Sequence, residues 1–200
     1  MLDVMIKAII FDFGGVVLRV KDEDVRKRLC ELLGIDEREF KELIEKRLAK
    51  LQTGKMSVHE FSAMVEGRCK VGKVEATWEQ AYRETAVLNQ KVWELAKKLK
   101  KKYRVGLISN VLDMHARLNR RDALYKPFDP VFLSCEVGMK KPEKGIFELA
   151  LKKLGLKAGD CVFIDDRKEN LVEPRKMGFH VIHFGNVKKL KNELKERGVK

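Results

Sequence analysis

The 200-residue sequence lacks several features that would point to particular classes of protein. No apolar run approaches the roughly 18 residues that a membrane span needs, and the N-terminus lacks the pattern of a signal peptide. The four cysteines stand far apart and form no CxxC or Cys/His metal spacing: Cys30, Cys69, Cys135 and Cys161. We therefore expect a cytoplasmic protein with free thiols and no membrane partner.

The sequence also lacks a basic cluster interleaved with aromatic residues, although its formal net charge is +13. The excess of Lys and Arg is spread over stretches such as 94–102 and 188–200, where acids are interleaved. This distribution favours solubility and a general attraction of anions, and we expect no specific nucleic-acid partner. The high charged fraction, 36%, is consistent with a surface rich in ion pairs and with a thermophilic source.

A short stretch near the N-terminus combines an apolar run, one acid and two glycines. Ile9, Ile10 and Phe11 are typical of a strand buried on both faces of a parallel sheet. Asp12 would then lie at the carboxyl end of that strand, where ligands of open α/β sheets bind. Gly14-Gly15 would allow a tight turn and a close approach of the backbone to a ligand. Taken alone, the stretch fits a solvated Asp at an ordinary turn equally well.

Residues 22–88 show helical periodicity and no strand-like alternation. Asp36 suits the N-cap of a helix that ends at Gly54, and Ser57 with Glu60 forms a capping box. A further helix is expected over 75–88. The pattern predicts a small all-helical unit inserted after the first strand.

From residue 89 onward, strands and helices alternate. Strands are expected at 103–110, 130–135, 161–164 and 180–184, and helices at 92–99, 146–154, 187–197 and in the segment through Arg175 that ends at Gly178. This order predicts an α/β fold, a doubly wound, Rossmann-like parallel sheet of about five strands. The predicted core comprises residues 1–18 and 89–200, and the predicted cap domain comprises 19–88.

Polar residues end three of the predicted strands: Asp12, Ser109-Asn110 and Asp165-Asp166. In a parallel sheet these ends share one edge, and clustered carboxylates repel one another unless a cation compensates them. Oxygen ligands of this kind favour Mg²⁺. Pro142 suits the first turn of a helix, so that Lys140 or Lys141 before it could reach the carboxylates, although solvated lysines are common.

These residues resemble the four motifs of the haloacid dehalogenase superfamily, in order and with room for a cap insertion between the first and second. The motifs are residues 12–17, 107–110, 138–143 and 163–166 with Asn170. The resemblance is to the branch that holds phosphatases of the glucose-1-phosphatase type and the phosphatase-like domain of epoxide hydrolase proteins. Residues 54–57 with Phe61, and 170–178, resemble that branch too.

The resemblance implies a hydrolase of phosphoric monoesters, acting on small phosphorylated metabolites as a monomer or homodimer. It makes Asp12 the nucleophile that forms an aspartyl-phosphate. Ser109, the backbone amide of Asn110, Lys141 and Gly14 would contact the phosphoryl group. The implied Mg²⁺ ligands are Asp12, the carbonyl of Gly14, Asp166 and, directly or as a supporting residue, Asp165.

One position departs from the superfamily pattern. Most of its phosphatases carry a second Asp, a general acid and base, where this sequence has Gly14. That assistance is worth about 10²–10⁴-fold in rate. A good leaving group, a water or cap residue in its place, or low activity would each explain the glycine.

Other functions remain as alternatives. Metal-independent dehalogenases of the superfamily also lack the second Asp, but they would leave the adjacent acids Asp165-Asp166 unexplained. A non-catalytic module that uses its cap to bind a protein is a second alternative. A Ser/His/Asp triad on Ser109 lacks the nucleophile-elbow motif, and His180 and His183 are expected to be structural.

Overall fold

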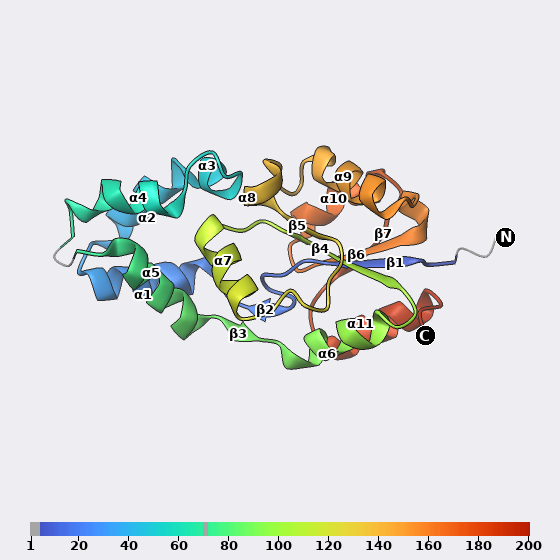
Figure 1. Cartoon of the computed structure of the whole chain (residues 1–200). Helices are drawn as coiled ribbons and strands as arrows, with labels where there is room; N and C mark the ends of the chain where they lie inside the picture. Colours follow the sequence, from blue (N-terminus) through green and yellow to red (C-terminus); the bar gives the residue numbers. More distant parts are fainter. Residues whose placement is uncertain (1–4, 70–71) are drawn as a thin grey trace.

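The computed structural model describes residues 5–69 and 72–200 and has two parts, a central sheet and a set of helices beside one end of it (Figure 1). Residues 1–4 of the predicted core and 70–71 of the predicted cap lie outside the described residues. The sheet has five parallel strands in the order β5-β4-β1-β6-β7. Their bounds are β1 Ala8–Phe11, β4 Arg104–Ser109, β5 Val131–Leu133, β6 Cys161–Asp165 and β7 His180–His183. The predicted α/β fold is confirmed.

Strand β1 occupies the centre of the sheet because it pairs on both sides. Ile9 lies opposite Val105 of β4 and Val162 of β6, and all four residues of β1 are buried. Asp12 continues this pairing, since its N–H donates to the carbonyl of Ile164 at 2.8 Å. The apolar run therefore carries Asp12 to the carboxyl edge of the sheet.

Helices cover both faces of the sheet (Figure 1). On one face lie α9 (Lys144–Leu154) and α10 (Val172–Lys176), and on the other α6 (Gln90–Leu99) and α11 (Val187–Glu196). Short 3₁₀ turns, η1 (Ala158–Asp160) and η2 (Lys168–Leu171), flank β6. The alternation along β1 divides the core, since Ile10 packs in the cluster of Phe147 and Phe163 whereas Ile9 and Phe11 belong to the larger cluster.

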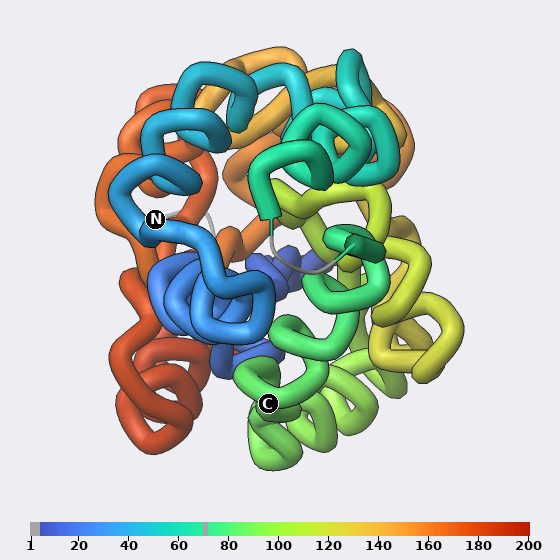
Figure 2. The backbone as a smooth tube through the Cα atoms, turned by 90° about the vertical axis from the view of Figure 1, so that its left-hand side faces the viewer, coloured from blue at the N-terminus to red at the C-terminus, as the bar shows by residue number. Residues whose placement is uncertain are grey.

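Five helices form what we call the helical lobe: α1 Asp22–Leu33, α2 Glu37–Glu45, α3 Leu48–Gln52, α4 Val58–Glu66 and α5 Val74–Thr85. Figure 2 views the molecule from the side of this lobe, which lies in front of the sheet. Asp36 caps α2 and Ser57 with Glu60 forms a capping box on α4, as predicted. Phe40, Phe61 and Trp78 pack edge to face, each pair with centroids 5.8 Å apart. The apolar stripes of these helices thus bury one another.

Two short strands join the lobe to the sheet. β2 (Leu18–Arg19) leads into the lobe and β3 (Val87–Leu88) leads out, and they pair antiparallel. The Asn89 N–H donates to the carbonyl of Val17 at 2.8 Å, which ties the two connections together. The lobe also contacts α7 (Asp113–Arg121) through α5, and α8 (Ser134–Val137) through α3.

Several details differ from the predicted elements, and the sequence signals did not predict helix α7. The helix expected from Asp36 to Gly54 is divided into α2 and α3, and the helix expected over 75–88 ends at Thr85 because Val87 pairs in β3. The strand expected at 130–135 ends at Leu133, since the Ser134 hydroxyl accepts the Val111 N–H at 3.0 Å and the chain turns into α8. Helix α9 begins at Lys144, so Pro142 precedes it, and the Lys141–Pro142 peptide bond is cis.

Candidate active site

Three carboxylates meet where β1 and β6 end. Asp12, Asp165 and Asp166 each offer an oxygen within 4.8 Å of the others. The Lys141 Nζ lies 2.6 Å from Asp12 Oδ1 and 2.7 Å from Asp165 Oδ2. Lys141, Asp12 and Asp165 are buried. The structure thus brings together four of the residues that the sequence singled out.

Burial and charge shift the pKa values of these groups. Desolvation raises the pKa of Asp12 to about 7, against the opposing attraction of Lys141. Desolvation, aided by the charge of Asp165, also raises the pKa of Asp166. Burial disfavours the charged form of Lys141, but Asp12 and Asp165 outweigh it and raise the lysine's pKa. The three ionised carboxylates together with one ammonium carry a net charge of −2, which one divalent cation would neutralise.

The two adjacent acids have different surroundings. Asp165 accepts hydrogen bonds from the Asn170 amide at 3.1 and 3.2 Å and from the Arg167 N–H at 2.8 Å, besides the bond from Lys141. Asp166 Oδ1 is buried, and no hydrogen-bond partner for it lies within the described part of the chain. Asp165 is therefore saturated by the protein, whereas Asp166 has an oxygen available for a cation.

Gly15 makes room for the Asp166 carboxylate. Its φ is +80°, and a Cβ at this position would lie 2.2 Å from Asp166 Oδ2. Gly14 is different, because a Cβ there would contact only Val20 Cγ1, at 3.8 Å. Within the glycine pair, the backbone therefore passes close to a protein side chain at Gly15, and the expected approach to a ligand stays a prediction.

The Asn110 side chain holds the segment that presents Lys141. Its Nδ2 donates to the Lys141 carbonyl at 2.9 Å, and its Oδ1 accepts the Lys141 N–H at 2.8 Å. This pair of bonds fixes the backbone of Lys141, while its neighbour Lys140 is half-buried and has no such anchor among the described contacts. The sequence pattern alone allowed either Lys140 or Lys141 to reach the carboxylates, and in the structure Lys141 does so.

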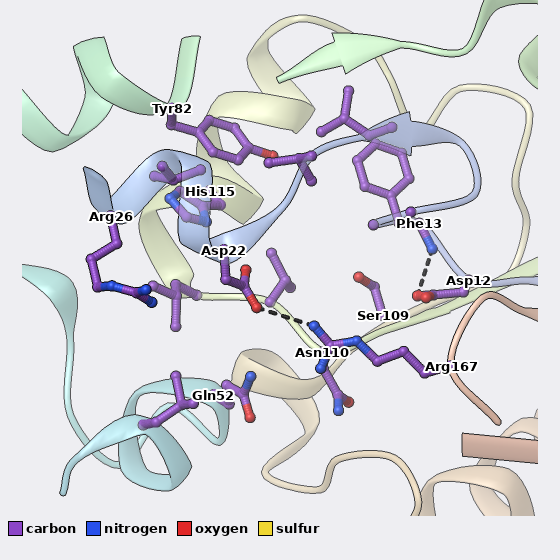
Figure 3. Close-up of a pocket in the computed structure, with 18 of the residues that line it drawn as sticks. Asp12, Phe13, Asp22, Arg26, Gln52, Tyr82, Ser109, Asn110, His115 and Arg167 are labelled. Atoms are coloured by element: carbon purple, nitrogen blue, oxygen red, sulfur yellow. Dashed lines mark hydrogen bonds and ion pairs between the residues drawn. The ribbon is translucent and has the colours of Figure 1, made fainter. Parts of the chain in front are cut away.

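A pocket extends from this cluster, and Figure 3 shows it. Asp12, Gly14, Ser109, Asn110, Lys141 and Asp166 all line it. Asp165 does not line the pocket, and its side chain is fully buried behind Lys141. Two charged residues of its lining pair with each other, since the Arg167 Nη2 lies 3.3 Å from Asp22 Oδ2 of α1 (Figure 3).

Several residues have roles at this site that the sequence did not predict. The anchoring bonds of the Asn110 side chain, the ion pair of Arg167 and the fit of Gly15 against Asp166 all depend on contacts between distant segments. His183, which was expected to be structural, holds the backbone of Asp166, since its Nε2 lies 2.9 Å from that carbonyl oxygen. Of these roles, only that of Gly15 has a feature in the sequence that could have predicted it, the Gly14-Gly15 pair.

Comparison with known proteins agrees with this geometry. The family model described as haloacid dehalogenase-like hydrolase matches residues 6–173, which is most of the chain. The family match agrees with three features of the structure: the central parallel sheet, the helical lobe and the acid cluster with its buried lysine. The chain belongs to the haloacid dehalogenase-like hydrolase family, and the predicted hydrolase class is confirmed.

Two curated relatives and one solved structure illustrate the similarity. D-ribitol-5-phosphate phosphatase of Bacteroides thetaiotaomicron is 26% identical over 95% of this chain and 97% of its own length. Bifunctional epoxide hydrolase 2 of Rattus norvegicus is 28% identical over 86% of this chain, which spans only 35% of that longer protein. A HAD-family enzyme of B. thetaiotaomicron, solved in complex with magnesium and inorganic phosphate, superposes with a TM-score of 0.80 at 22% identity, over 92% of this chain and 98% of its own.

Proposed function

We propose that this protein is a Mg²⁺-dependent phosphatase of small phosphorylated metabolites that forms an aspartyl-phosphate on Asp12. The observation that carries the proposal is the buried Asp166 Oδ1, which has no hydrogen-bond partner among residues 5–69 and 72–200 and lies in a cluster of three carboxylates with one lysine. Hard divalent cations prefer such oxygen ligands. The phosphatase relative and the magnesium–phosphate complex of a similar fold support the same function.

The residues divide into ligands and positioning groups. Asp12, Asp166 and the carbonyl of Gly14 would hold Mg²⁺, which when bound neutralises charge on the carboxylates and on the phosphoryl oxygens. Asp165 is better suited to orient Lys141 than to bind the ion directly, because its oxygens already accept hydrogen bonds. Ser109 and the backbone amide of Asn110 would bind the phosphoryl oxygens.

The reaction has two displacements. An Asp12 carboxylate oxygen attacks phosphorus, the ester P–O bond breaks, and its electron pair leaves with the alcohol oxygen, which takes a proton from water. A water molecule then attacks phosphorus, the bond to Asp12 breaks, and the carboxylate and inorganic phosphate are released. Lys141 holds Asp12 in place and stabilises negative charge on the phosphoryl group. Gly14 offers no proton for the first step.

We further propose that the chain divides into a core of residues 1–18 and 89–200 and a cap of residues 19–88. We also propose that the protein is cytoplasmic. The β2–β3 pair supports this division, since the chain passes between sheet and lobe at that point. Opening of the cap would admit water for the second displacement. No helix in the described ranges 5–69 and 72–200 is both long and apolar enough to cross a bilayer.

Phosphate release from a panel of phosphate esters, with Mg²⁺ and with EDTA, tests the function. We expect release only with Mg²⁺, and we expect Asp12→Asn to lower kcat by at least about 10³-fold because the nucleophile is lost. Asp24→Asn, an exposed acid on α1, is the matched control and should retain full activity. Halide release from 2-haloacids in EDTA would instead indicate a dehalogenase. Tight Mg²⁺ binding without turnover of any ester would indicate a binding module.

A further inference from the structure

The pocket continues from the acid cluster into the helical lobe. Its volume is about 320 Å³, near the lower end of the ~300–1,000 Å³ typical of small-molecule sites. We call its far part the lobe chamber. Apolar and aromatic side chains form its walls: Val25, Leu29, Phe40, Ile44, Leu48 and Trp78. A compact molecule with an apolar body would fill this space.

Some polar groups beside the chamber are paired within the protein, whereas the Gln52 side chain, which also lines the pocket, has no hydrogen bond among the described residues. The Tyr82 hydroxyl and the Asn119 amide exchange hydrogen bonds at 3.0 and 3.1 Å. The Arg26 guanidinium lies 3.1 Å from a Glu37 carboxylate oxygen. The apolar walls offer few partners to an alcohol with several hydroxyl groups, and each buried unpaired hydroxyl weakens binding.

Two buried ring nitrogens at the chamber wall also lack a partner within the described part of the chain. Trp78 Nε1 and His115 Nε2 are buried, and neither has a hydrogen-bond partner among residues 5–69 and 72–200. The His115 ring stacks on Tyr82, with centroids 3.8 Å apart and planes 11° apart, and Trp78 meets it edge-on at 6.2 Å. Desolvation lowers the pKa of His115 to about 3, so the ring stays neutral and attracts no second anion. The indole N–H can only donate, which leaves it in need of an acceptor.

We propose that the alcohol half of the substrate is a compact aromatic alcohol whose ring carries a hydrogen-bond acceptor. Its ring lies in the lobe chamber while the phosphoryl group lies beside Asp12, and the acceptor pairs with Trp78 Nε1. The inference rests on the proposed function and narrows it to one substrate class. It separates this protein from its relative named for D-ribitol 5-phosphate, whose alcohol is a polyol.

Phosphonates test the chamber without turnover, because their P–C bond is not hydrolysed by the displacement described above. Calorimetry on the full chain with Mg²⁺ would compare methylphosphonate, 4-isopropylbenzylphosphonate and 4-acetylbenzylphosphonate. We expect the two aryl compounds to bind at least about tenfold more tightly than methylphosphonate, and the acetyl compound to bind more tightly than its isopropyl analogue of similar shape. Equal binding of aryl and methyl compounds, or of the two aryl compounds, would overturn the proposal.

Variants locate the binding to the proposed side chains. Ile44→Asn places a polar group on the chamber wall and should weaken both aryl compounds about tenfold while leaving methylphosphonate unchanged. Leu43→Asn is its matched control, because Leu43 is also half-buried on α2 but does not line the pocket. Trp78→Phe keeps an aromatic ring and should remove the preference for the acetyl compound. Equal effects of the two α2 variants, or an acetyl preference that survives Trp78→Phe, would count against this placement.

Turnover separates this inference from the function on which it rests. Benzyl phosphate and D-ribitol 5-phosphate both release primary alcohols, so a difference between them reports recognition rather than leaving-group quality. We expect kcat/KM to be at least about tenfold higher for benzyl phosphate. If both esters react and the polyol is preferred, the chamber proposal fails and the phosphatase function stands. If neither ester reacts while the phosphonates rank as expected, the phosphatase function fails and the aromatic site stands.

Discussion

Gly15 and Gly14 are neighbours with different structural roles. The left-handed backbone of Gly15 passes close to the Asp166 carboxylate, whereas Gly14 has an open position beside Val20. A side chain at position 15 would therefore displace the Asp166 carboxylate, whereas position 14 has room for one. Two predictions use this difference.

We expect Gly15→Ala to weaken Mg²⁺ binding by about 10–100-fold, the usual effect of disturbing the support of a metal ligand. The added methyl carbon would lie 2.2 Å from Asp166 Oδ2, so the carboxylate would have to move. Gly14→Ala is the control, since it keeps the backbone carbonyl and contacts only Val20. Mg²⁺ titration by calorimetry measures both variants, and equal affinities would contradict the assigned role of Gly15.

The second prediction concerns the absent proton donor. If Gly14 limits the first displacement, aryl phosphates, whose leaving groups need no acid, should react far faster than alkyl phosphates in the unmodified protein. Gly14→Asp should then raise kcat for alkyl esters by about 10²-fold or more and reduce the dependence on leaving-group pKa. Gly14→Asn has a similar shape without a titratable proton and should give no such gain. A rate independent of leaving-group pKa in the unmodified protein would disprove this explanation.

Helices α5 and α7 form one of the contacts between the lobe and the rest of the structure. Their exposed ion pairs, Glu75–Arg117 at 2.9 Å and Glu79–Arg121 at 2.7 Å, contribute little stability because solvent screens them. The buried contact of His115 with Tyr82 contributes more, and it gives this pair of helices a sensitivity to acid.

The pKa of His115 in the folded protein, about 3, lies below the usual value of 6.5. Its contribution to stability is therefore complete above pH 6.5 and is lost as the pH falls towards 3, because the unfolded chain binds a proton that the folded protein does not. We expect the free energy of unfolding to fall more steeply between pH 6.5 and 4 in the natural protein than in His115→Phe, by at most about 1.4 kcal/mol per pH unit. Urea titrations at four pH values measure this difference, and parallel pH profiles would contradict it.

The sequence predicts the helices and strands whose positions depend on local sequence signals. Apolar runs located all five sheet strands, and side-chain caps located the starts of α2 and α4. Local signals did not predict β2 and β3, because two-residue strands are too short to show alternation. They also left Lys140 and Lys141 equivalent, since the distinction depends on Asn110, which is remote in sequence and anchors only Lys141.

At the scale of the whole molecule, the lobe touches the sheet domain closely at a point away from the β2–β3 pair. Gly54 has a φ of +69°, and a Cβ there would lie 2.1 Å from the backbone carbonyl oxygen of Cys135 in α8. This contact and the paired strands together fix the position of the lobe over the pocket.

We expect Gly54→Ala to destabilise the protein by about 1–3 kcal/mol and to raise KM, because the lobe must shift away from α8. Gly155→Ala is the matched control. Its φ of +62° imposes a similar backbone cost, but apart from its chain neighbours no atom of the described residues lies within 4 Å of the added Cβ, so KM should not change. Thermal unfolding and steady-state kinetics measure the two effects. A KM change of equal size in both variants would show that the contact with Cys135 does not position the lobe.

The central place of β1 also has a consequence for biosynthesis. The strand that carries Asp12 leaves the ribosome before both of its neighbours in the sheet, which contain Val105 and Val162. Until the segments of β4 and β6 have been translated, an apolar strand with two unpaired edges is exposed, which is a recognised risk for aggregation. The cluster of Asp12, Asp165 and Asp166 is complete only when β6 has inserted beside β1, so chains that stop before residue 161 should lack the proposed Mg²⁺ site and should depend on chaperones.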